Sequence, residues 1–132
     1  MRRTVICGSY HRDGEGLASV FREIESHGVR ILSPISIDFV DRMEPVVRTE
    51  HEGTLSIYEL EKFHLRAMRD ADFVWLHCPG GHIGLSASYE IGFAHALDIP
   101  VFSSELPQDE MLASQVRVVA SVFHALEWGG WV

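Results

Sequence analysis

The sequence predicts an α/β protein of three layers, built on a flavodoxin-like (Rossmann-like) five-stranded parallel sheet with strand order 2-1-3-4-5. Short apolar runs alternate along the chain with segments of helical periodicity, and glycine, proline or serine follows most of the runs. The run FVWLHC at 73–78 is apolar almost throughout, as expected for a central strand buried on both faces. With 132 residues, 46% of them apolar, we expect one domain spanning 1–132.

The first half of the chain predicts a β–α–β unit. Residues 4–9 (TVICGS) form a strand that ends in a glycine turn, and residues 13–27 form a helix stopped by Gly28. A second strand at 29–32 follows, and this spacing favours a parallel pair with a right-handed crossover. The long loop at 35–56 has no regular pattern, so it is either functional or a disordered surface excursion.

The second half continues the alternation. The main alternative near the C-terminus is one long helix over 108–126, but the VRVV segment is better suited to a strand. The expected elements are a helix at 57–71, a strand at 73–78, a turn and helix at 79–97, a strand at 100–104, a short helix at 108–113, a strand at 116–120 and a last helix from Ser121 to Trp128.

Composition excludes several classes of partner. The formal net charge of −8 argues against non-specific binding to nucleic acid or anionic membranes. No apolar stretch approaches a membrane span, and the N-terminal apolar run is too short for a signal peptide. Cys7 and Cys78 form no CxxC motif, and we expect them to be free thiols in a reducing cytoplasm.

Glu90 is the most unusual residue of the sequence. On a helix, the face around it carries mainly small and apolar side chains, so a carboxylate lies within an apolar stripe about one turn into the helix. A glutamate is rarely buried without a partner. The helix dipole would hold Glu90 ionised against the cost of burial, and a fixed carboxylate suits a nucleophile or a stabiliser of an oxocarbenium ion. The alternative is a structural glutamate that binds backbone N–H groups.

The predicted topology places a ligand site at the carboxyl ends of strands one and three. Two glycine-bearing turns meet at that edge, and the start of a helix there is a ready anion site. Either turn alone could be plain turn geometry, but together they favour a crevice for phosphate or ribose. The candidate binding residues are Gly8, Ser9, His11, Arg12, Gly81, Ser86 and Ser88.

Histidines raise the question of a metal. His77, His82 and His95 lie near Cys78 in the sequence, but their spacing matches no tight zinc motif. We therefore expect no metal and no cofactor. His64 lies on an apolar helix stripe and is expected to be a core or pocket-wall histidine.

The segment SYEIGFAHALDIPVF around Glu90 resembles the glutamate motif of the nucleoside 2-deoxyribosyltransferase family and its nucleotide N-glycosidase relatives. The CGS after the first strand, and the Asp70-Ala71-Asp72 that precedes an apolar strand, extend the similarity loosely over residues 4–105. The resemblance implies that Glu90 is the nucleophile, forming a covalent (deoxy)ribosyl intermediate. It also implies that Gly8, Ser9, Arg12, Ser86 and Ser88 line the sugar or phosphate end.

This sequence departs from the family in places. His64 stands eight residues before Asp72, where the family usually carries an aspartate that holds the sugar and nucleophile. Glu61, one helical turn earlier, is a candidate substitute. Ser86 and Ser88 replace glycines that usually lie four and two residues before the glutamate.

The expected function is cleavage or transfer of the N-glycosidic bond of a nucleoside or nucleoside 5′-monophosphate. The alternatives are a non-catalytic nucleotide-binding or sensing domain, a structural domain with a vestigial site, and a phosphoribohydrolase of the cytokinin-activating type. The PGG at 79–81 resembles the motif of this last family, but here no threonine follows it and Glu90 lies too far downstream. Because family relatives complete their sites with a neighbouring subunit, a homodimer or larger homo-oligomer is expected. The C-terminal WGGWV either packs on such a partner or folds back over the chain's own core.

Overall fold

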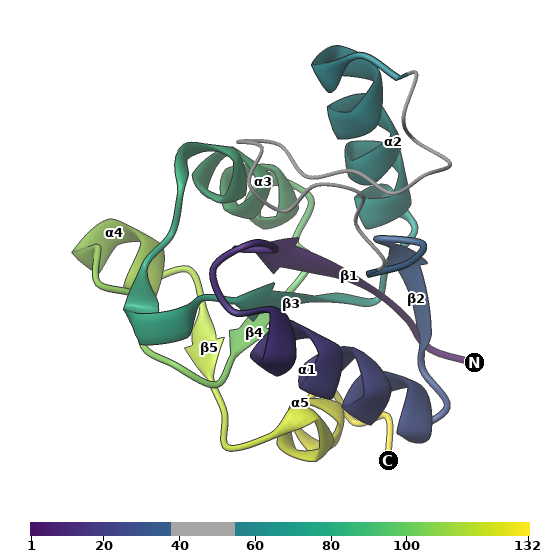
Figure 1. The fold of residues 1–132 in the computed structure, drawn as a ribbon. Coiled ribbons are helices and arrows are strands. Elements are labelled where there is room, and N and C mark those ends of the chain that lie inside the picture. Colours follow the sequence, from purple (N-terminus) through teal and green to yellow (C-terminus); the bar gives the residue numbers. More distant parts are fainter. Residues whose placement is uncertain (38–54) are drawn as a thin grey trace.

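The computed structural model describes residues 1–37 and 55–132 (Figure 1). Most of the predicted loop at 35–56, residues 38–54, lies outside the described part of the chain. The prediction for this segment is therefore not tested. The elements below all belong to the two described ranges.

A parallel five-stranded sheet forms the middle layer, in the predicted order β2-β1-β3-β4-β5. Strands β1 and β3 lie at its centre and pair in continuous register from Thr4 with Phe73 to Gly8 with His77. The α/β class and the strand order inferred from the sequence are thus confirmed. The strands are β1 (Arg3–Gly8), β2 (Arg30–Ser33), β3 (Phe73–His77), β4 (Val101–Ser103) and β5 (Arg117–Val118).

Helices cover both faces of the sheet. In Figure 1, α1 and α5 lie on one face, and α2 and α3 lie on the other. The two buried clusters follow this division, since Leu17 of α1 and Leu126 of α5 belong to one, and Met68 of α2 and Ile91 of α3 belong to the other. The helices are α1 (Gly14–Ser26), α2 (Ile57–Arg69), α3 (Leu85–Ala96), α4 (Glu110–Ala113) and α5 (Val122–Trp128), with a 3₁₀ turn at Pro79–Gly81.

Side-chain caps fix where three of these helices begin. Asp13 accepts a hydrogen bond from the backbone N–H of Gly16, and Ser121 accepts one from that of His124. Ser56 and Glu59 form a reciprocal capping box at the start of α2. The caps stabilise otherwise unpaired N–H groups, which explains why these helices start within a residue or two of the predicted positions.

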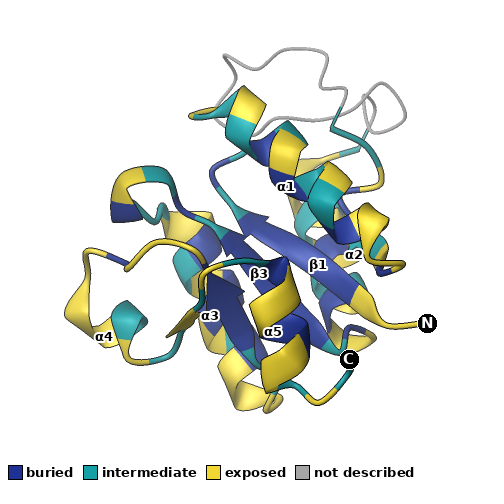
Figure 2. Ribbon diagram, turned by 90° about the horizontal axis from the view of Figure 1, so that it is seen from below, coloured by how far each residue is buried: buried dark blue, intermediate teal, exposed yellow. Residues whose placement is uncertain are grey.

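The C-terminal region settles two alternatives. The long helix over 108–126 is wrong, because a short strand pairs with β4 between α4 and α5. The final residues fold back over the chain's own core: the ring of Trp131 stacks on Phe73 at 5.3 Å, and that of Trp128 packs edge-on against Phe102 at 5.4 Å. The central strands are buried and the outer helix faces exposed (Figure 2). No described helix has both the length and the apolarity needed to cross a membrane.

Candidate functional site

A pocket of about 360 Å³ opens at the carboxyl ends of β1 and β2, between α2 and the start of α3. This is the edge of the sheet that the topology predicts for a ligand. Its lining combines polar and apolar side chains with backbone from two glycine turns. The lining residues are Gly8, Ser9, Tyr10, His11, Arg12, Ser33, Pro34, Ile57, Leu60, Glu61, His64, His82, Gly84, Leu85, Ser86, Ala87 and Glu90.

Gly8 allows the turn after β1 to pass close to β3. Its φ is +117°, and a Cβ placed there would lie 2.0 Å from the carbonyl oxygen of His77. Only glycine fits both the conformation and the close approach. The next residue, Ser9, donates its backbone N–H to the same carbonyl at 3.0 Å and is buried in the pocket wall. The CGS sequence therefore positions Ser9 by backbone geometry.

The carboxyl group of Glu90 is buried at the inner end of the pocket, and the residue is only 6% exposed. Glu90 lies in α3, whose neighbouring residues Ala87, Ile91 and Ala94 are also buried. This confirms the sequence prediction of a carboxylate within an apolar stripe. Its oxygen Oε1 is 3.5 Å from Nε2 of His64, so the carboxylate has a partner from α2.

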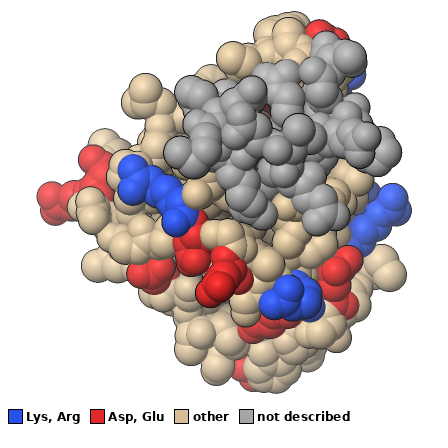
Figure 3. All heavy atoms as spheres, in the orientation of Figure 1, with Lys and Arg blue, Asp and Glu red and all other residues tan. Residues whose placement is uncertain are grey.

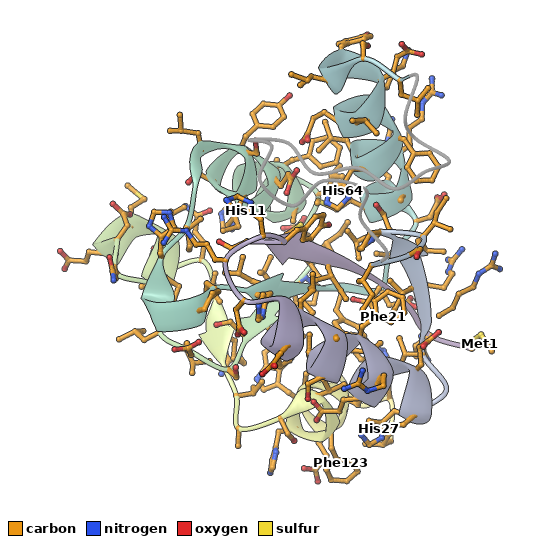
Figure 4. The ribbon with its side chains drawn as sticks, viewed as in Figure 1. Met1, His11, Phe21, His27, His64 and Phe123 are labelled. Carbon is orange, nitrogen blue, oxygen red and sulfur yellow. The ribbon has the colours of Figure 1, made fainter. Side chains whose placement is uncertain are left out.

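His64 connects four elements of the fold. Its Nδ1 lies 2.7 Å from the hydroxyl of Ser33 at the end of β2, and its Nε2 lies 3.4 Å from Sγ of Cys7 in β1. Because an ionised carboxylate only accepts, Nε2 carries a hydrogen toward Glu90. The Nδ1 atom accepts from the Ser33 hydroxyl when the ring is neutral and donates to it when the ring is charged. Ser33 thereby holds the orientation of the ring. Figure 4 shows His64 projecting from α2 over β1.

The two carboxyl groups of the cluster, Glu61 and Glu90, have pKa values shifted in opposite directions. Burial would raise the pKa of Glu90, but a hydrogen bond and charge attraction from His64, with further hydrogen bonds from Glu61 and Cys7, hold that pKa below its usual value. Burial raises the pKa of Glu61 to about 8, and its hydrogen bond to Glu90 and the charge of Glu90 add to this rise. At neutral pH the pair therefore consists of a protonated Glu61 and an ionised Glu90. Burial first, and then Glu90, raise the pKa of the Cys7 thiol well above its ordinary value.

The start of α3 offers unpaired backbone donors to the pocket. The N-cap residue is Gly84, which has no side chain to cap the helix, and Gly84, Ser86 and Ala87 all line the pocket. First-turn N–H groups and the helix dipole together favour an anion at such a position. His11 and Arg12, both exposed, follow β1 and line the same pocket. Figure 4 shows His11 near the end of β1.

On the face shown in Figure 3, the described residues form no basic patch that would suit a broader anionic partner. On the face shown in Figure 3, Lys and Arg side chains are dispersed among Asp and Glu. A small anionic ligand needs only a local set of donors, and the start of α3 provides one. A long polyanion would need an extended basic surface, which the described residues on this face do not form.

Seven of the nine predicted site residues meet in this pocket: Gly8, Ser9, His11, Arg12, His64, Ser86 and Glu90. The other two, Gly81 and Ser88, lie outside the lining. The backbone of Gly81 packs against the loop after β4, where its carbonyl accepts from the N–H of Gln108. The hydroxyl of Ser88 donates to the carbonyl of Gly84 within its own helix. Both residues are close in sequence to lining residues. The conformation of the turn places Gly81 outside the pocket, and the helix places Ser88 outside it.

Sequence reasoning missed two members of the cluster. Ser33 is the last residue of β2 and lies at the same sheet edge as Ser9, so the topology carried a signal for it. Cys7 carried none, because a cysteine in a buried strand is usually a small apolar residue. Glu61, the candidate substitute for the missing aspartate, does line the pocket beside Glu90.

The residues that could hold a metal ion differ from those the sequence raised. Of the histidines considered, His95 is exposed, and His77 lies 3.7 Å from Asp13. Among the described residues, the ligand atoms that gather are those of Cys7, His64 and Glu90, which lie within 4.8 Å of one another and are all buried.

Comparison with known proteins adds no relative: no family model, curated protein or solved structure matches this chain.

Proposed function

We propose that this protein cleaves or transfers the N-glycosidic bond of a nucleoside or nucleoside 5′-monophosphate, with Glu90 as the nucleophile. The observation that supports this most is a buried, ionised carboxylate at the inner end of a pocket whose mouth carries anion-binding groups. The resemblance of the Glu90 segment to the nucleoside 2-deoxyribosyltransferase family points to the same reaction.

The chemistry follows from the groups in the pocket. An oxygen of Glu90 attacks C1′ of the sugar from the face opposite the base, through an oxocarbenium-like state. The C1′–N bond breaks, its electron pair leaves with the base, and the base takes up a proton for which the neighbouring Glu61 carboxyl is a source. Water, or a second base, then attacks C1′, the C1′–O bond to Glu90 breaks, and the proton lost by the attacking group returns to the Glu61 carboxylate. The first route is hydrolysis and the second is transfer.

A phosphate on the substrate has a natural position in this proposal. The start of α3 presents backbone N–H groups, and Ser9, His11 and Arg12 follow β1 at the same pocket. A 5′-phosphate bound there would lie at one end of the pocket while C1′ lies near Glu90. These groups favour the 5′-monophosphate over the free nucleoside.

Base release from a panel of ribo- and deoxyribonucleosides and their 5′-monophosphates, followed by chromatography, tests the proposal. Wild-type protein should release the base from at least one substrate, and Glu90→Ala and Glu90→Gln should abolish release from all of them. Glu25→Gln is the matched control, because Glu25 is exposed on α1 away from the pocket. A Glu90→Ala variant that keeps more than about 1% of the rate would refute the nucleophile, since losing a covalent nucleophile costs several orders of magnitude.

The second candidate is a non-catalytic domain that binds or senses nucleotides. The pairing of His64 with Glu90 favours it, because this histidine occupies the place of the family's usual aspartate and engages the nucleophile. Calorimetry with the same panel separates the two functions, since binding without base release from any substrate supports the sensor. A phosphoribohydrolase would act only on ribose 5′-monophosphates within the panel. The expected homodimer remains a prediction that light scattering of the purified chain can check.

A further inference from the structure

We propose that Cys7, His64 and Glu90 form a binding site for a single thiophilic divalent cation, with Zn²⁺ as the best match. The three side chains come from β1, α2 and α3, and so from positions far apart in the sequence. Each offers one ligand atom, and these atoms lie within 4.8 Å of one another in a buried setting. Thiolate, imidazole and carboxylate are the three kinds of ligand that zinc takes in proteins.

The distances fit a tetrahedral ion. With zinc–ligand lengths of about 2.3 Å to sulfur and about 2.0–2.2 Å to nitrogen and oxygen, a tetrahedron has edges of about 3.6 Å from sulfur to nitrogen and about 3.4 Å from nitrogen to oxygen. The observed separations are 3.4 Å between Cys7 Sγ and His64 Nε2, and 3.5 Å between His64 Nε2 and Glu90 Oε1. Two of the three ligand pairs therefore already have tetrahedral spacing, and the third pair, Cys7 Sγ and a Glu90 oxygen, lies within 4.8 Å.

The groups around the site support the same geometry. Ser33 holds His64 through Nδ1 at 2.7 Å, which leaves Nε2 directed at the other two ligands. Such an outer hydrogen bond is what orients metal-binding histidines in general. Binding would release the Cys7 thiol proton to solvent. In a neutral ring the Nε2 hydrogen would move to Nδ1, which then donates to the Ser33 oxygen, and in a charged ring the Nε2 proton would also leave to solvent. Two anionic ligands then neutralise the divalent charge, so no net charge is buried.

The pocket supplies the access route and the fourth ligand. His64 and Glu90 both line it, so an ion can enter from solvent and keep a water molecule on its open side. Three protein ligands and one open position distinguish this arrangement from a closed structural zinc site. If the proposed function holds, the bound ion coordinates the nucleophile Glu90, and zinc should then inhibit base release.

Isothermal titration of chelator-treated wild-type protein with ZnCl₂ alone tests the site without any substrate. We expect one ion per chain, a micromolar or tighter dissociation constant, and proton release measured from two buffers of different ionisation enthalpy. Cys7→Ser and His64→Ala should lose binding, and Ser33→Ala should weaken it by about 10–100-fold. Cys78→Ser is the matched control, because Cys78 is the other buried free cysteine and bonds to the carbonyl of Glu105 instead. Circular dichroism checks that each variant is folded.

Cobalt substitution gives a readout in the wild-type protein, so it does not depend on whether any variant folds. Wild-type protein with CoCl₂ should show the visible bands of a tetrahedral ion and a near-ultraviolet thiolate-to-cobalt band. Both should persist in Cys78→Ser and vanish on addition of excess Zn²⁺. Absence of zinc binding in the wild type, or binding that survives Cys7→Ser, would overturn the site. Neither result bears on base release, so the metal site and the proposed function can fail separately.

Discussion

Replacing Gly8 by alanine tests whether the close approach of β1 to β3 builds the pocket. The added Cβ would lie 2.0 Å from the carbonyl oxygen of His77, and a φ of +117° is strained for any residue with a Cβ. Backbone strain of about 1–3 kcal/mol and overpacking of about 1–3 kcal/mol predict a loss of roughly 2–6 kcal/mol. For a chain of this length, each kcal/mol lowers the melting temperature by about 4 °C, so we expect a fall of roughly 8–24 °C.

Thermal and urea denaturation measure this loss, and a glycine elsewhere supplies the control. Gly92 lies in the interior of α3, is exposed, and has no atom within 4 Å of an added Cβ. Gly92→Ala should therefore stabilise the protein by about 0.5–1 kcal/mol, through helix propensity alone. The same chemical change would thus have opposite signs at the two positions. If Gly8→Ala changed stability by less than about 0.5 kcal/mol, the argument that this contact requires glycine would be refuted.

Two further predictions concern the core and the second thiol. Trp131→Ala should lower stability by about 2–4 kcal/mol in urea denaturation, because the ring stacks on Phe73 and the Arg2 guanidinium lies 5.6 Å from its centroid. An unchanged midpoint would mean that the C-terminal segment contributes nothing to the core. Burial raises the pKa of the Cys78 thiol to about 11, so less than a few per cent is thiolate at pH 9. Alkylation of Cys78 in the folded protein, followed by peptide mass spectrometry, should therefore be at least about 10-fold slower at pH 9 than in urea; equal rates would contradict the raised pKa.

The fold could be predicted because its signals are local or follow from general rules of topology. Helical spacing of apolar residues marks α1 and α2, caps such as Ser121 mark where helices start, and the apolar FVWLHC run marks β3. Parallel pairing and right-handed crossovers then leave few strand orders. Strand β5 was the least certain element, and it forms only two paired residues at the edge of the sheet.

The site was predicted less completely, since two of the residues expected there lie outside the lining of the pocket. Gly81 and Ser88 lie within a few residues of true pocket residues, but a left-handed turn and the rotation of α3 direct them away. Residues that are close in sequence can face different surroundings at a turn, because a residue with positive φ sends the chain in a direction that other residues rarely adopt.

The sequence by itself determined the α/β architecture, the edge at which the pocket opens and the burial of Glu90. Only the tertiary structure decided what surrounds that carboxylate. Cys7 and His64 are 57 residues apart, and Ser33 and His64 are 31 apart, so no periodicity within one element relates them. They meet because the pairing of β1 with β2 and β3 fixes the strand ends, while α2 packs its buried His64 and Met68 onto that sheet. Contacts of this kind depend on register and packing across the whole domain, which local patterns do not encode.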